Sequence, residues 1–149
     1  MSDVALRRIV ETDRAAWRPL WDGYLDFYAH SLPEEMTEHT WRRVVDDVEL
    51  KGLIAIDNAS GAALGFTHYF YHPSTWRRPG SCYLEDLFVT PASRGKRVGR
   101  RLIEEVAGIA QRAGYNRLYW QTEEFNGPAR RLYERLAKRT PFVRYQIDF

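Results

Sequence analysis

The chain has 149 residues, of which 44% are hydrophobic and 28% charged, with a formal net charge of +2. These values predict one globular domain over residues 1–149 and exclude a disordered chain. The single cysteine, Cys82, excludes an internal disulfide and a thiolate metal cluster. No apolar run is long enough for a transmembrane helix or a secretory signal, so we expect a cytoplasmic protein with no membrane partner.

Basic residues cluster in two segments, Arg94–Arg101 and Arg130–Arg139. The chain as a whole is nearly balanced, with 22 Lys and Arg against 20 Asp and Glu. Local positive charge on a balanced chain favours a small anionic ligand and argues against a nucleic acid. The alternative is a solvated helix face rich in arginine.

The first third of the chain predicts one strand and two helices. Val4–Val10 is typical of a strand, and Thr12 or Asp13 caps the helix that follows. The pattern Ser31–Glu34, with proline in its first turn, is typical of a capping box and opens a helix to about Leu50. We assign the aromatic residues of the first helix mainly to the core by their helical spacing; they are Trp21, Tyr24, Phe27 and Tyr28.

The middle of the chain predicts three strands. Leu53–Ile56 and Ala62–Tyr71 are joined by a polar loop with hairpin chemistry, and Cys82–Thr90 follows a Pro-Gly turn. His68 and His72 share a face of the second of these strands, but no third ligand has suitable spacing, so no metal site is expected. We expect Cys82 to be a buried structural thiol.

The last third predicts a long helix, a strand, a helix and a final strand. The long helix follows Gly95–Gly99 and ends at Gly114 as its C-cap. Arg117–Thr122 is a strand, Pro128–Arg139 a helix and Phe142–Phe149 the last strand. The order β-α-α-β-β-β-α-β-α-β predicts an α/β domain with a mixed central sheet, in which the strands around the long helix are parallel neighbours.

The most specific pattern lies where a strand ends, a basic glycine-bearing loop follows and an amphipathic helix begins, at Arg94–Gly99. N–H groups at a helix start lack internal partners, and the helix dipole favours an anion there. Gly95 and Gly99 permit close approach of a phosphate, and arginines add charge-assisted hydrogen bonds. The spacing fits neither a Walker A loop nor a G-x-G-x-x-G fingerprint. The alternative is an ordinary strand-to-helix turn.

Arg94-Gly-Lys-Arg-Val-Gly99 resembles the R-x-x-G-x-G pyrophosphate loop of the GCN5-related N-acetyltransferases, with Arg97 at the position of its central glycine. The order of elements resembles that fold over nearly the whole chain. The resemblance implies acetyl-CoA as cosubstrate, with its pantetheine arm paired to the strand that precedes the loop. It implies cofactor contacts at Leu87, Phe88, Val89, Arg94, Gly95, Lys96, Arg97, Val98, Gly99, Arg100, Asn126 and Arg130.

The strand Tyr83–Val89 carries two adjacent carboxylates. Strand alternation predicts Glu85 on the face of Tyr83 and Leu87, and Asp86 on the opposite face. The stretch Y-L-E-D-L-F-V resembles the corresponding strand of spermidine/spermine N1-acetyltransferases, which implies that Glu85 takes the proton of the acceptor amine through water. The alternative is a carboxylate paired with a local arginine.

The segment from Asn126 to Tyr133 has the spacing N-x-P-A-x-x-L-Y, which resembles the family stretch of a cofactor-binding asparagine and a general-acid tyrosine. The resemblance therefore implies that Asn126 contacts acetyl-CoA and that Tyr133 protonates the coenzyme A thiolate. Seven positions are about two helical turns, so both side chains can address one groove. The alternative for Tyr133 is a core aromatic on the Leu132–Leu136 stripe.

The resemblance implies an acetyl-CoA-dependent N-acetyltransferase that acts on a primary amine by direct attack in a ternary complex. Two alternatives are a catalytically silent acyl-CoA-binding regulatory module of the same fold and a small nucleic-acid-binding protein. Leu118–Glu123 and Ala129–Arg135 also resemble Hpa-type histone and polyamine acetyltransferases, which implies a homodimer. The identity of the acceptor amine stays open.

Overall fold

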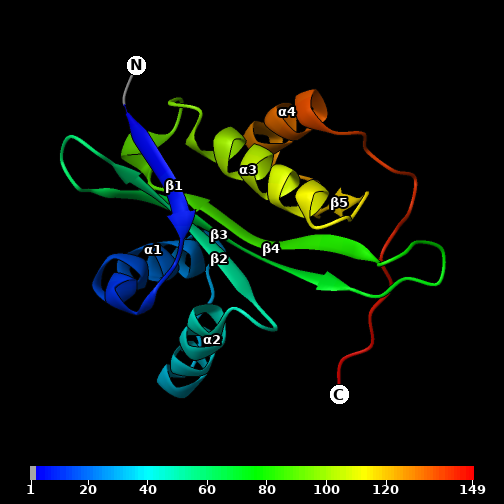
Figure 1. Cartoon of the computed structure of the whole chain (residues 1–149), viewed down its shortest axis with the longest axis horizontal. Coiled ribbons are helices and arrows are strands. Elements are labelled where there is room, and N and C mark those ends of the chain that lie inside the picture. Colours follow the sequence, from blue (N-terminus) through cyan, green and yellow to red (C-terminus); the bar gives the residue numbers. More distant parts are fainter. Residues whose placement is uncertain (1–2) are drawn as a thin grey trace.

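A computed structural model describes residues 3–149 of the chain (Figure 1). Two short 3-10 turns, Glu11–Asp13 and Pro91–Ser93, precede helices or loops of the domain. The strands and helices are β1 (Val4–Arg8), α1 (Arg14–Phe27), α2 (Glu34–Asp46), β2 (Lys51–Asp57), β3 (Ala63–His72), β4 (Ser81–Val89), α3 (Val98–Arg112), β5 (Leu118–Tyr119) and α4 (Gly127–Leu136).

The strands form one mixed sheet in the order β1-β2-β3-β4-β5. Neighbours from β1 to β4 are antiparallel, whereas β4 and β5 are parallel because α3 crosses between them. The predicted α/β class and the predicted parallel pair are therefore confirmed. Helices α1 and α2 lie on one face of the sheet, and α3 with α4 lies on the other (Figure 1).

Each face of the sheet has its own hydrophobic core. The core beneath α3 includes Cys82, whose burial raises the pKa of its thiol to about 12, so the predicted structural thiol is confirmed. The opposite core is aromatic, and Trp17 at its centre is fully buried. The largest members of that core are Trp17, Trp21, Trp41, Phe66 and Phe88.

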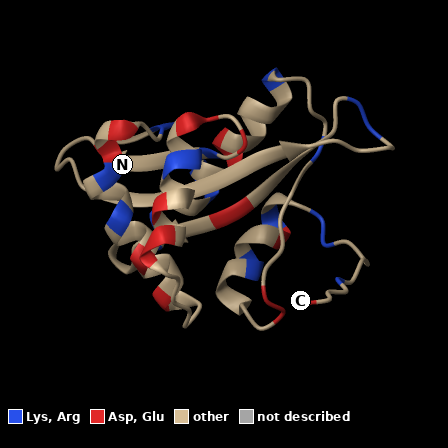
Figure 2. Cartoon of the chain, turned by 90° about the horizontal axis from the view of Figure 1, so that it is seen from below, with Lys and Arg blue, Asp and Glu red and all other residues tan. Residues whose placement is uncertain are grey.

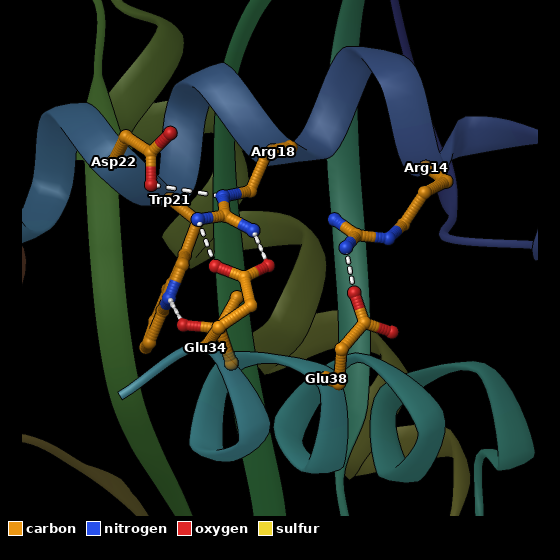
Figure 3. A network of polar contacts seen from close by, with 7 residues as sticks. Arg14, Arg18, Trp21, Asp22, Glu34 and Glu38 are labelled. Atoms are coloured by element: carbon orange, nitrogen blue, oxygen red, sulfur yellow. Dashed lines mark hydrogen bonds and ion pairs between the residues drawn. The ribbon is translucent and has the colours of Figure 1, made fainter. Parts of the chain in front are cut away.

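Helices α1 and α2 are joined by ion pairs on their outer surface (Figure 3). The Arg18 guanidinium donates to both oxygens of Glu34, at 2.7 Å for Nη2 to Oε2, and to Asp22 Oδ1 at 3.0 Å. Arg14 pairs with Glu38 one turn away on both helices. Exposed pairs of this kind contribute about 0.2–1 kcal/mol each, so they fix orientation more than they stabilise the fold.

A buried hydrogen bond ties the same helices together. Trp21 Nε1 donates to Thr37 Oγ1 at 3.1 Å, which satisfies the indole inside the aromatic core. The expected capping box at Ser31–Glu34 is not formed. Pro33 is the N-cap of α2 without a side-chain cap bond, because the Glu34 carboxylate is engaged by α1 instead.

Strand β4 contains a β-bulge in its middle. The register pairs His68 with Asp86 and then Tyr69 with Leu84, so Glu85 has no partner on β3. A bulged residue interrupts the alternation of side chains between the two faces. This local change decides where the two acidic side chains of β4 point, as the site described below shows.

Some predicted boundaries are corrected by the structure. The expected strand Phe142–Phe149 is not formed, and the strand expected over Arg117–Thr122 shrinks to the two residues of β5. Helix α2 ends at Asp46, because Asp47 takes a left-handed backbone with φ of 57°. The alternating pattern at the chain end specifies a strand face, but a strand also needs a partner edge, and this segment pairs with no strand of residues 3–149.

Candidate active site

Strands β4 and β5 separate soon after they meet. They pair only at Cys82 with Leu118 and at Tyr83 with Tyr119. Beyond Tyr83, no strand of residues 3–149 pairs with β4 on the side facing β5, while β3 covers its other edge through to Val89. The predicted pantetheine-binding residues Leu87–Val89 therefore lie on the open edge of β4, beside the gap.

The predicted phosphate turn lies between this open edge and α3. The Arg101 N–H donates to the Arg97 carbonyl at 3.0 Å as the first bond of α3, and no side chain caps the helix. The N–H groups of the three residues before Arg101 therefore point out of the helix end, where an anion is favoured. At Gly99 an added Cβ would lie 3.5 Å from Val89 Cγ2, so glycine keeps the helix start open toward β4.

Arg97 has a left-handed backbone, with φ of 63°, directly before α3. Gly95 in the same turn has φ of 85°. The conformation suits glycine, so the turn keeps a glycine-type geometry at Arg97 even though the residue has a side chain. A non-glycine residue there bears a conformational cost of about 1–2 kcal/mol, which a contact of the guanidinium with a phosphate can offset.

The other basic residues near this turn are held to different degrees. Arg94 donates from Nε to the Val89 carbonyl at 3.3 Å, and its guanidinium lies over the Phe27 and Phe88 rings at 5.7 and 5.9 Å from their centroids. Arg100 pairs with Glu104 on the surface of α3. Arg130 is held by the Glu124 carbonyl at 2.9 Å and by Glu134.

The bulge in β4 places both acidic side chains on the α1 face of the sheet, which corrects the expected alternation. Asp86 Oδ2 lies 2.9 Å from Nδ1 of His68, a residue that packs among the aromatic rings beneath α1. Glu85 acts on the ionisation of Tyr24, which is on α1. Partial desolvation and the neighbouring Asp86 charge raise the pKa of Glu85.

The candidate general acid is half-buried on α4. The Tyr133 ring packs edge-on against Trp120, with centroids 5.5 Å apart, and burial raises the pKa of its phenol to about 12. Its hydroxyl therefore keeps its proton across the physiological range. Neither core cluster includes a residue of α4, so Tyr133 belongs to a separate contact between α4 and the segment after β5.

Asn126 precedes α4 as its N-cap. Its Nδ2 donates to Thr122 Oγ1 at 3.3 Å, and its carbonyl accepts the Arg130 N–H at 2.9 Å. These bonds fix the loop between β5 and α4. The side-chain oxygen of Asn126 is left available to a ligand, since it accepts no hydrogen bond within the described residues 3–149.

The structure adds side chains to the site that the sequence did not single out. The Tyr24 hydroxyl faces Asp86, and Tyr28 faces both Asp86 and Tyr133, although helical spacing alone assigned both tyrosines mainly to the core. Arg144, in the segment after α4, acts electrostatically on Glu85. No signal in the sequence connects Arg144 with Glu85, because 59 positions separate them along the chain.

The two histidines do not form a metal site. His68 is buried between Trp17 and Asp86, whereas the His72 Nε2 lies 2.7 Å from the Tyr119 hydroxyl. No group of three potential ligands is present in the part of the chain that the structure describes. None of the helices in residues 3–149 combines the length and apolar character that a membrane crossing requires.

Comparisons with known proteins show the family of the chain. Residues 15–137 match the model of the acetyltransferase (GNAT) family. The chain is 37% identical over 144 residues to the D-amino-acid N-acetyltransferase HPA3 of Saccharomyces cerevisiae, covering 96% of this chain and 89% of that protein. It is 33% identical over 145 residues to the uncharacterized N-acetyltransferase YhfO of Bacillus subtilis, covering 96% of each.

Solved structures share the fold at lower identity. The ribosomal-protein-alanine N-acetyltransferase from Brucella melitensis has a TM-score of 0.82 at 20% identity, over 99% of both chains. AAC(6')-Iy in complex with a bisubstrate analog has a TM-score of 0.79 at 21% identity, over 98% of this chain and 100% of that one.

The fold together with the family match defines the class of protein as an acyltransferase that uses a coenzyme A thioester. The chain belongs to the acetyltransferase (GNAT) family, and it is an acetyl-CoA-dependent N-acetyltransferase.

Arg97→Gly tests whether the substituted side chain holds the cosubstrate. We expect an unchanged or slightly higher Tm, because relief of the left-handed conformation, about 1–2 kcal/mol, is opposed by the chain entropy of glycine. The Kd for acetyl-CoA should rise about tenfold at low salt and less at high salt, since one exposed charge-assisted contact is lost. Calorimetric titration at two salt concentrations measures both.

Arg112→Ala is the matched control, because it removes the same charge from the opposite end of α3, where the side chain is exposed. It should leave the Kd unchanged at both salt concentrations. Equal affinities of the Arg97 and Arg112 variants would show that the Arg97 guanidinium does not touch the cosubstrate.

Proposed function

We propose that the enzyme transfers the acetyl group directly to a small primary amine in a ternary complex, with Glu85 as general base and Tyr133 as general acid. Acetyl-CoA supplies the activated acetyl thioester. The proposal rests mainly on the bulge in β4, which turns Glu85 toward the α1 face beside Asp86 and raises the pKa of its carboxyl. A carboxylate with a raised pKa is better matched to accept a proton near neutral pH.

The residues around the gap between β4 and β5 fit the cosubstrate. The outward N–H groups of Val98–Arg100 and the side chains of Arg94 and Arg97 would hold the pyrophosphate. The open edge of Leu87–Val89 would pair with the pantetheine amides as an added strand does. Asn126 would complete this site from the loop before α4.

The two proton-holding groups then have opposite tasks. An amine at neutral pH is mostly an ammonium ion, and it attacks only after losing a proton, which Glu85 would accept directly or through one water. Tyr133 would hold a proton at its hydroxyl and release it to the departing sulfur, where negative charge develops late. Burial of the Tyr133 phenol keeps that proton in place until then.

The names of similar proteins and one positive charge near the site suggest which class of acceptor amine to test first. The relatives include proteins named for D-amino acids and for thialysine. Arg144 acts electrostatically on Glu85 and Tyr83, so it would attract a carboxylate at the acceptor side. We therefore place D- and L-amino acids first in an assay panel, followed by diamines and polyamines. Binding of acetyl-CoA without thiol release for any amine would favour the catalytically silent module.

Tyr133→Phe removes one oxygen and keeps the ring against Trp120. We expect Tm and the Kd for acetyl-CoA to change little. The kcat should fall ten- to a thousandfold, about 1.4–4 kcal/mol, because the donor acts on charge that develops only as the thiolate leaves. Thiol release under saturating substrates measures kcat. A variant that melts at much lower temperature but keeps its kcat would assign Tyr133 a packing role.

Glu85→Gln keeps the size of the side chain and removes its basic oxygen. The ionised carboxylate is the active form. The rate of the parent enzyme should therefore fall on the acidic side of its pH profile, where Glu85, whose pKa is raised, becomes protonated. Turnover should therefore fall by about 10²–10⁴-fold above the pKa of Glu85, where the parent has its base, and the acidic limb that this carboxyl causes in the parent should be lost in the variant. A profile of kcat/KM against pH checks this, with Glu49→Gln as an exposed control. A profile identical to the parent's would contradict the base role.

We also propose that the enzyme is a cytoplasmic homodimer whose C-terminal segments, residues 142–149, contact the second copy. The segment is extended, and alternate residues are apolar and exposed. The outer edge of β5 lacks a neighbouring strand among the described residues. Each copy thus carries one unpaired segment and one open edge, which a two-fold exchange between copies satisfies together. The exposed apolar residues are Phe142, Val143, Tyr145, Ile147 and Phe149.

Tyr145→Asp combined with Ile147→Asp tests this interface. We expect the parent enzyme to sediment as a dimer and the double variant as a monomer, because two buried apolar side chains would be replaced by charges. Phe125→Asp is the control, since Phe125 is equally exposed but lies in the loop before α4. Sedimentation velocity at several concentrations measures the mass. A monomeric parent, or a dimeric double variant, would contradict the proposal.

A further inference from the structure

A buried chain of hydrogen bonds lies directly behind the two carboxylates of β4. The Trp17 indole donates from Nε1 to His68 Nε2 at 3.0 Å, and His68 Nδ1 lies 2.9 Å from Asp86 Oδ2. Trp17 and His68 are almost completely buried, and Asp86 is close to solvent. The chain therefore connects the aromatic core to the acceptor side of the sheet.

The chemistry of the partners assigns the proton of His68. An indole N–H can only donate, so Nε2 must be the accepting nitrogen of the neutral ring. The ring proton then sits on Nδ1 and is donated to the Asp86 carboxylate. Protonation of Nε2 would break the bond to Trp17 inside the core, so the buried environment favours this single tautomer.

The two adjacent carboxylates, Glu85 and Asp86, differ in the hydrogen bonds that they accept. Asp86 accepts the Nδ1–H of His68 and faces the Tyr24 hydroxyl. The Glu85 side chain accepts no hydrogen bond from any group within the described residues 3–149. Hydrogen bonds to a carboxylate favour its ionised form, and a neighbouring negative charge disfavours it. In such a pair, the carboxylate that accepts hydrogen bonds stays ionised, and the other carboxylate is protonated first.

We propose that His68 is a positioning residue that acts through Asp86 and reserves proton uptake for Glu85. It does so by donating a hydrogen bond that only Asp86 receives, while the bulge keeps Glu85 beside Asp86 but beyond the reach of this donor. The proposal deepens the function proposed above and rests on the role of Glu85 as the base. Its consequence is that the acceptor amine and Glu85 exchange a proton without competition from Asp86.

The other groups near Glu85 do not decide which of the two carboxylates is protonated first. The tyrosines around it are neutral, because burial raises the pKa of each phenol. Arg144 is the remaining cation, and it favours the ionised form of Glu85, against the effect of Asp86. The groups that act on Glu85 are Asp86 and Tyr83 of β4, His68 of β3, Tyr24 of α1, Tyr119 of β5 and Arg144.

Carboxyl-carbon NMR of the full-length enzyme, labelled at Glu Cδ and Asp Cγ, reads each ionisation directly. Glu85→Gln and Asp86→Asn assign the two resonances. In the parent, the Glu85 resonance should move in the upper titration step and that of Asp86 in the lower one. In His68→Leu, the Asp86 midpoint should rise by about one pH unit, so that both resonances move in the upper step.

Asp86→Asn should lower the Glu85 midpoint by about one pH unit, since a negative neighbour is lost. Adding His68→Leu to Asp86→Asn should move Glu85 further by much less than Asp86→Asn itself does, because the main effect of His68 acts through Asp86. His68→Asn keeps an N–H donor near the position of Nδ1 and should restore the parent order of titration. This variant and Asp86→Asn decide the question if His68→Leu does not fold.

Thr67→Val is the structural control. It removes the hydroxyl that donates to the Asp86 carbonyl at 2.7 Å, and it leaves the carboxylates and His68 intact. It should lower Tm without changing the order of the two titrations. An Asp86 resonance that already moves first in the parent, or a Glu85 midpoint that ignores Asp86→Asn, would overturn the proposal. Because NMR does not depend on turnover, failure of Glu85 as the base shows separately in the pH profile of Glu85→Gln.

Discussion

The short parallel contact between β4 and β5 is the constraint on which the rest of the site depends. Two residue pairs hold the strands together, and beyond them the backbone edge of β4 is open. Helix α3 must start where β4 ends, because it is the crossover between the two strands. Its unpaired N–H groups therefore lie next to the open edge, and one elongated ligand can use both. The same geometry leaves β5 with an outer edge that no strand of residues 3–149 covers.

The bulge in β4 decides where the acidic side chains of this strand point. A regular strand would send one of two adjacent carboxylates toward the α3 core, where an unpaired charge is costly. With the extra residue, both carboxylates face the α1 side, where His68 and the tyrosines meet them. The rigid aromatic core around Trp17 fixes His68, and His68 fixes Asp86. Acidic residues elsewhere are interspersed with basic ones on the helices (Figure 2), and several form ion pairs with a basic residue one turn away on the same helix.

Arg97 combines an unfavourable backbone conformation with a positively charged side chain. Its left-handed backbone is the geometry that glycine adopts at least cost, and the loop keeps this geometry with an arginine. The cost falls on the folded protein at all times, whereas the proposed guanidinium contact would be gained only when the cosubstrate binds. Such a residue lowers the stability of the free enzyme in return for affinity.

The sequence by itself determined the class of the fold, the basic turn before α3 and the position of Tyr133 on α4. These depend on local order: a strand, a glycine-bearing basic loop, a helix, and fixed spacing along one chain segment. The sequence could not determine the faces of Glu85 and Asp86, since a bulge is set by the neighbouring strand and not by the alternation of residues. Nor could it place His68 behind Asp86 or Arg144 beside Glu85, since those contacts join residues from different strands and from the chain end. The alternating pattern of residues 142–149 indicated a strand, but only the tertiary structure could show that no edge within residues 3–149 receives it. Local sequence specifies which conformation a segment favours, whereas pairing and packing between distant segments decide where its side chains meet.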